Sequence, residues 1–88
     1  MSYVYRADVL RALLQHGIRP TEGTPPELAR GFVRDLYRYE LRNLREQMLR
    51  QAFPKHEFAD RVIQLRDRYR VLSLLPREFL EALDNARS

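Results

Sequence analysis

The stretch HEFAD, from His56 to Asp60, is the part of the sequence that most resembles a catalytic metal site. On a helix, His56 and Asp60 would face the same way, with Glu57 where the HExxH pattern of metalloproteases places its general base. Aspartate replaces the second histidine, however, and His16, the other histidine, is far away in the sequence. The simpler interpretation is that the two acids stabilise a helix N-terminus and that Glu57 pairs with Arg61. We therefore predict no metal site here.

Other catalytic chemistry has no recognisable site either. The chain has no cysteine, and none of its serines lies in a G-x-S-x-G nucleophile elbow. Its three glycines are isolated, and none begins a phosphate-binding loop. We expect no catalytic residue, no enzyme activity, no cofactor and no small-molecule substrate.

The basic residues are more informative, because almost all of them are arginines. The chain has 16 Lys and Arg residues and a net charge of +4, and Lys55 is its only lysine. On a helix with about 100° between residues, five arginines fall within a third of the circumference. This arginine stripe consists of Arg30, Arg34, Arg38, Arg42 and Arg45. It could bind the carboxylates of a protein or the phosphates of a nucleic acid; a GC-rich genome would also explain the arginine content.

Glu40 lies on the opposite, apolar side of the same predicted helix. A carboxylate in that position needs an arginine or a hydrogen-bond donor, or its pKa rises. The candidate partners are Arg61, Arg66 or Arg68, or a tyrosine hydroxyl. We expect a buried or interface ion pair that sets the register of two helices. A general base is the alternative, but no companion residue supports it.

Three tyrosines, Tyr37, Tyr39 and Tyr69, are candidates for aromatic contacts. Tyrosine rings can stack on the bases of a nucleic acid. They can also pack in a core while the hydroxyl reaches the surface, which is the simpler use.

Glycines and prolines divide the chain into segments that predict helices over residues 6–16, 25–51, 55–70 and 76–84. Gly17 is predicted to take the left-handed position that ends the first helix, with Ile18 packing back on it. In TPPE, Thr24 and Glu27 predict a capping box at the start of the second helix.

These helices predict a single all-α domain, residues 1–88. The second helix, roughly 40 Å long, would form an antiparallel hairpin with the third, and the two short helices would flank it. The expected core consists of Leu10, Leu14, Phe32, Leu36, Leu44, Phe58, Val62, Leu65 and Phe79.

The segment NLREQMLRQAFPKHEFADRVIQL, residues 43–65, resembles the short helical hairpin of SHOCT modules. The matching positions are Leu44, Met48 and Phe53 before the turn, and Glu57, Phe58 and Leu65 after it. The glycine usual before the turn is replaced by Gln51 and Ala52, and the lysine common in the second helix is missing. The resemblance implies a role in protein interaction or oligomerisation.

The predicted function is therefore a small cytoplasmic protein-interaction module that self-associates or docks on a larger protein. Binding of nucleic acid through the arginine stripe is the alternative. No apolar run approaches the roughly 18 residues that a membrane span needs, so no membrane role is expected. The lack of cysteine suits the cytoplasm.

Overall fold

Three α-helices and three short 3-10 helices form the fold in the computed structural model, which describes residues 2–82. The α-helices are α1 (Ala7–Gln15), α2 (Pro26–Leu49) and α3 (Phe58–Arg68). The 3-10 helices are η1 (Lys55–Glu57), η2 (Arg70–Ser73) and η3 (Pro76–Phe79). No β-strand occurs within this part of the chain, and Tyr5 and Leu80 form one isolated antiparallel bridge. The all-α prediction is confirmed, but the prediction of four helices is wrong.

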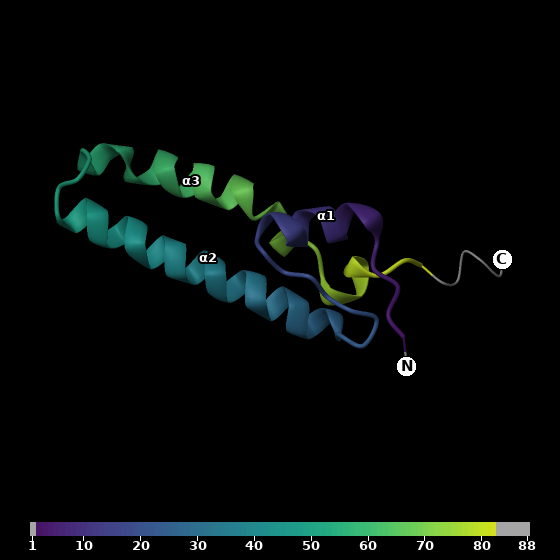
Figure 1. The fold of residues 1–88 in the computed structure, drawn as a ribbon. Helices are drawn as coiled ribbons and strands as arrows, with labels where there is room; N and C mark the ends of the chain where they lie inside the picture. Colours follow the sequence, from purple (N-terminus) through teal and green to yellow (C-terminus); the bar gives the residue numbers. More distant parts are fainter. Residues whose placement is uncertain (1, 83–88) are drawn as a thin grey trace.

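The two long helices give the molecule an elongated shape. Helices α2 and α3 lie side by side and run in opposite directions (Figure 1). Helix α1 and the C-terminal segment lie near the C-terminal end of α3 (Figure 1). The radius of gyration is 16.2 Å and the extents are 55 × 23 × 16 Å. A compact chain of this length would have a radius of gyration of about 12 Å. Part of α2 and α3 therefore extends beyond the core as a two-helix arm.

The predicted helix 76–84 is replaced by one 3-10 turn and an extended segment. After η3, the backbone pairs with the N-terminal segment: Arg6 N–H donates to the Phe79 carbonyl at 2.9 Å, and Glu81 N–H donates to the Val4 carbonyl at 2.8 Å. These backbone groups therefore pair with the N-terminal segment of the same chain instead of forming a helix. Residues 83 and 84 of the prediction lie outside the described residues.

The ends of the helices follow the local signals only in part. Gly17 has φ 78°, and Ile18 N–H donates to the Leu13 carbonyl at 2.9 Å, which confirms the predicted helix stop. The capping box at TPPE is wrong. Helix α2 begins one residue later, at Pro26, and the Thr24 hydroxyl instead accepts the N–H of Thr21 at 2.9 Å.

The turn after α2 uses the same left-handed geometry as Gly17, but without glycine. Gln51 has φ 62°, Gln51 N–H donates to the Met48 carbonyl, and Ala52 N–H donates to the Gln47 carbonyl. This hydrogen-bond pattern is a Schellman motif, which glycine usually completes. The turn therefore carries a small backbone strain at Gln51.

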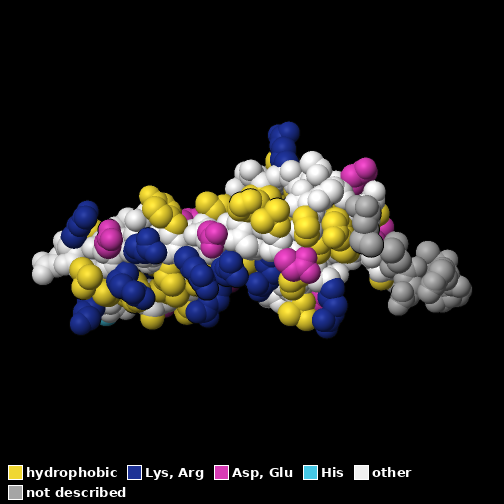
Figure 2. Space-filling view, turned by 90° about the horizontal axis from the view of Figure 1, so that it is seen from below, with side chains coloured by type: hydrophobic (Ala, Val, Ile, Leu, Met, Phe, Trp, Pro, Cys, Tyr) yellow, Lys and Arg dark blue, Asp and Glu magenta, His cyan; other side chains and the backbone are white. Residues whose placement is uncertain are grey.

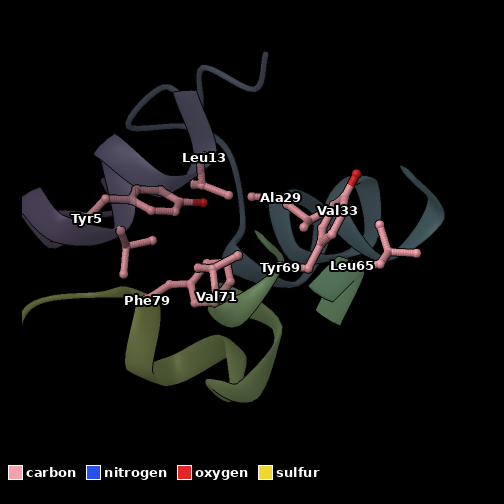
Figure 3. Packing of buried hydrophobic residues seen from close by; sticks show 9 residues of the cluster. Tyr5, Leu13, Ala29, Val33, Leu65, Tyr69, Val71 and Phe79 are labelled. Carbon is pink, nitrogen blue, oxygen red and sulfur yellow. The ribbon is translucent and has the colours of Figure 1, made fainter. Parts of the chain in front are cut away.

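The core lies where α1, the first half of α2, the end of α3 and the C-terminal segment meet (Figure 3). Its buried members are Tyr5, Val9, Leu13, Ala29, Val33, Leu65, Tyr69, Val71 and Phe79. Phe53, at the turn between α2 and α3, is also buried.

The predicted core is right for two residues and wrong for most of the others. Leu65 and Phe79 are buried, and Leu44, Phe58 and Val62 are half-buried. The exposed members are Leu10 (40% exposed), Leu14 (51%), Phe32 (51%) and Leu36 (38%). Val9, Leu13 and Val33, the neighbours of Leu10, Leu14 and Phe32, are buried in their place, because each helix is rotated by about one residue from the predicted orientation.

Candidate functional site

Four of the five stripe residues form an exposed arginine row on α2: Arg34, Arg38, Arg42 and Arg45. Most basic side chains in Figure 2 gather over the half of the molecule that lies away from the chain ends. Arg34 Nε lies 3.8 Å from the Asp35 carboxylate, an exposed contact of little energetic value. No side chain among residues 2–82 forms an ion pair with Arg38, Arg42 or Arg45. The row thus presents largely uncompensated positive charge.

Arg30, the remaining stripe residue, has a structural role. Its Nε donates to the Leu74 carbonyl at 2.9 Å and its Nη2 donates to the Leu72 carbonyl at 2.6 Å. Charge-assisted hydrogen bonds of this kind are stronger than neutral ones. Arg30 therefore binds η2 and the residue that follows it to α2, and its guanidinium group is not available to a partner in the way that the arginine row is.

An exposed strip of apolar side chains runs along α2 beside the arginine row. This apolar strip consists of Leu28, Phe32, Leu36 and Tyr39, spaced by four, four and three residues. On the helix it lies between the arginine row and the buried face that carries Ala29 and Val33. Figure 2 shows hydrophobic side chains in a band next to the basic ones. Phe32 and Leu36, which were predicted to lie in the core, therefore belong to the surface of α2.

A groove lies between the apolar strip and the loop that follows α1. It has a volume of about 640 Å³ and is lined by His16–Pro20 on one side and by Leu28, Phe32 and Leu36 on the other. Asp35 also lines it and is the acidic residue of the groove. Sequence reasoning did not identify this groove, although the packing of Ile18 after Gly17 brings the loop close to α2.

Glu40 is held by two residues near the end of α3. Arg68 Nη2 lies 3.1 Å from Glu40 Oε1, and the Tyr69 hydroxyl donates to Glu40 Oε2. The side chain of Glu40 is 40% exposed and that of Arg68 is 63% exposed, so of the two predicted alternatives, a buried pair and an interface pair, the buried pair is wrong. The carboxylate lies at the edge of the interface between the helices, where water still reaches the arginine.

The other two candidate partners of Glu40 form different contacts. Arg61 pairs with Glu57 at 3.1 Å, as predicted, and its guanidinium carbon lies 4.2 Å from the centre of the Phe53 ring. This cation–π contact covers the buried ring at the turn. Arg66 lines a separate surface pocket with Tyr37. Of the three arginines, only Arg68 reaches Glu40.

Tyr69 is the centre of an aromatic cluster. Its ring stacks on His16 with centroids 4.2 Å apart, and Tyr37 meets it edge-on at 5.4 Å. Burial, the hydrogen bond to Glu40 and the charge of Glu40 raise the pKa of Tyr69 to about 12. Tyr37 and Tyr69 thus serve core packing, whereas Tyr39 is exposed in the apolar strip. The hydroxyl of Tyr69 ties this packing to α2 through Glu40.

Residues 2–82 contain no cluster of three or more histidine or acidic side chains arranged to hold a metal ion. No helix in this part of the chain combines the length and the apolar character that crossing a bilayer requires. Comparison of the chain with protein-family models, with curated proteins and with solved structures found no significant match. The candidate site that the geometry offers is the surface of α2 with the exposed apolar strip and arginine row.

Proposed function

We propose that this chain is a helical protein-interaction module that binds its partner through the apolar strip of α2. The observation that carries the proposal is the exposure of Leu28, Phe32, Leu36 and Tyr39 on consecutive turns of one helix. A contiguous exposed apolar surface is typical of interaction sites. Aromatic residues and arginine, which border each other here, are also enriched in protein interfaces.

The arrangement of the arm supports this role. In the proposed module, α2 and α3 act as an antiparallel hairpin in which the contacts of Glu40 with Arg68 and Tyr69 keep α3 on one side of α2. The strip remains open on another side of a supported helix, so binding costs little ordering of the backbone. The resemblance of residues 43–65 to a SHOCT hairpin agrees with an interaction role. We place the module in the cytoplasm, since the chain lacks cysteine.

Site-directed photo-crosslinking in cells that express the protein tests this proposal. Phe32→p-benzoylphenylalanine places the reactive group in the strip, and Ile63→p-benzoylphenylalanine is the matched control, because Ile63 is 54% exposed on α3. We expect a discrete protein adduct from position 32, either with a second copy or with another protein, and none from position 63. A protein that gives no adduct at position 32 contradicts the proposal.

Nucleic-acid binding is the second candidate, and the arginine row, whose charge is largely uncompensated, favours it. Four arginines on one face of α2 could contact successive phosphates, with an affinity that falls steeply as salt rises. A mobility-shift assay at low salt, with duplex DNA and with structured RNA, tests this candidate. Nucleic-acid binding predicts a mobility shift that the double variant Arg38→Glu/Arg42→Glu abolishes. The absence of a shift with both nucleic acids would reject this candidate.

A further inference from the structure

We propose that the groove beside α2 binds an amphipathic helix whose apolar face is bordered by aspartate and glutamate. This inference rests on the proposed interaction function and adds the chemical character of the partner. It is carried by the groove and by the arginine row beside it, of which Arg34 and Arg38 lie alongside the apolar strip.

The groove has the shape that a helix requires. Along α2 the groove runs from Leu28 to Leu36, about 12 Å, and Tyr39 beyond it extends the apolar strip to about 16 Å. That length accepts about three turns of a bound helix, whose apolar side chains would recur every three or four residues. The loop with Ile18 forms one wall and gives the groove depth, so a projecting side chain can be buried against Phe32.

The charge of the borders selects an acidic helix. Arg34 and Arg38 lie alongside the strip, and Arg42 and Arg45 continue the row past its end at Tyr39. Arg38, Arg42 and Arg45 have no ion-pair partner within residues 2–82. Glutamates or aspartates beside the apolar residues of a bound helix would lie next to this row. Asp35, the acid within the groove, lies 3.8 Å from Arg34, so the charges of these two residues offset each other and Arg38 supplies the net positive charge beside the strip.

A second copy of the chain fits this surface less well. If two α2 helices packed antiparallel through their strips, the two arginine rows would lie on the same side of the interface and face each other. A parallel pair would place each row against the other copy's loop His16–Pro20, which carries Arg19. Like charges across an interface reduce affinity. A lipid surface is also a poor fit, because the groove is concave and Asp35 lines it.

Selection from a displayed library of helical peptides tests the proposal. The library has a fixed apolar face of leucine and phenylalanine, and its bordering positions vary among Asp, Glu, Gln, Lys and Arg. It is selected on the whole protein, with the variant Phe32→Glu used to remove clones that bind elsewhere. We expect enrichment of Asp and Glu at the bordering positions on one side.

The enriched peptide is then measured against three variants by titration calorimetry at two salt concentrations. Phe32→Glu should weaken binding on the order of a hundredfold, and Arg38→Glu/Arg42→Glu roughly tenfold or more. Ile63→Glu, the exposed control on α3, should have no more than about a twofold effect. Circular dichroism confirms that each variant remains helical.

Several results would overturn the inference. The first is selection of peptides that show no preference for Asp or Glu at the bordering positions, and the second is a selection in which no peptide binds. The third is self-association of the protein with a higher affinity than its binding of any selected peptide. Displacement of the selected peptide by phosphatidylserine vesicles or by duplex DNA at lower concentration than the peptide itself would assign the surface to lipid or nucleic acid. A cross-link from position 32 to a second copy would reject the acidic helix and still leave the interaction function standing.

Discussion

Among single residues, Glu40 is the one whose position on an apolar side of α2 demanded a partner. The structure supplies two, Arg68 and the hydroxyl of Tyr69. The arginine contact is largely exposed and contributes little. The tyrosine hydroxyl is attached to a buried ring, so its hydrogen bond is the more valuable one.

Replacing Tyr69 by phenylalanine should therefore lower the free energy of unfolding by about 1–2 kcal/mol at neutral pH. The pKa of Tyr69 is raised from 10.0 to about 12, so the folded state favours the protonated phenol. That contribution is fully present below pH 10 and is lost as the pH rises through about 12. Urea denaturation of both proteins across this range should show the difference between them shrinking.

Tyr39→Phe is the matched control, because Tyr39 is 60% exposed in the apolar strip. Removal of its hydroxyl should change the free energy of unfolding by less than about 0.5 kcal/mol at neutral pH. Equal effects of the two substitutions, or a difference that grows above pH 10, would contradict the role assigned to Tyr69.

At the scale of the helices, rotation about the axis decides what is core and what is surface. Helix α1 has two apolar stripes, one with Val9 and Leu13 and the other with Leu10 and Leu14. Only the first is buried. Helix α2 repeats this choice, because Ala29 and Val33 are buried while Leu28 and Phe32 are exposed. The larger side chains on α2 thus remain available to a partner.

Two substitutions in α1 measure this rotation. Leu13→Ala should lower the free energy of unfolding by about 2–5 kcal/mol, because it leaves a cavity beside the core. Leu14→Ala, one residue along the same helix, should cost less than about 1 kcal/mol, since its side chain is half exposed. Both introduce the same residue, so helix propensity cancels in the comparison of thermal or urea unfolding curves. Equal costs would contradict the orientation of α1.

At the scale of the whole molecule, the core lies toward one end and the arm extends from it. Nine buried residues form the core cluster. In the arm, Phe53 is buried at the turn, whereas Leu49 and Ile63 are exposed. The arm therefore depends on a narrower set of contacts than the core does. Local opening is expected where few apolar contacts hold the backbone.

Hydrogen exchange followed by mass spectrometry should show this gradient. Amides of the last turns of α2 and the first turn of α3 should exchange faster than those of α1 and of α2 near Val33. Protection at the tip should be lower by an amount that corresponds to at least about 1–2 kcal/mol of opening free energy. Uniform protection along α2 would show that the arm and the core unfold together.

The features that the sequence predicted well depend on residues close to one another in the chain. Gly17 and Ile18 form the helix stop, Pro54 separates the helices, and Glu57 pairs with Arg61 one turn away. Thr24 shows the limit of such signals. Its hydroxyl accepts the N–H of Thr21 in the preceding turn and not the N–H of Glu27, as the capping box predicted. A local motif predicts a hydrogen bond only when no nearby competitor offers another.

The sequence by itself determined the helical class, the approximate bounds of α1, α2 and α3, the arginine stripe and the need of Glu40 for a partner. Only the tertiary structure decided which apolar stripe is buried, that Arg30 binds the carbonyls of Leu72 and Leu74, and that residues 79–81 pair with the N-terminal segment. The physical reason is that helix formation depends on neighbours within about four residues. Helix rotation and strand-like pairing depend instead on segments far apart in the chain.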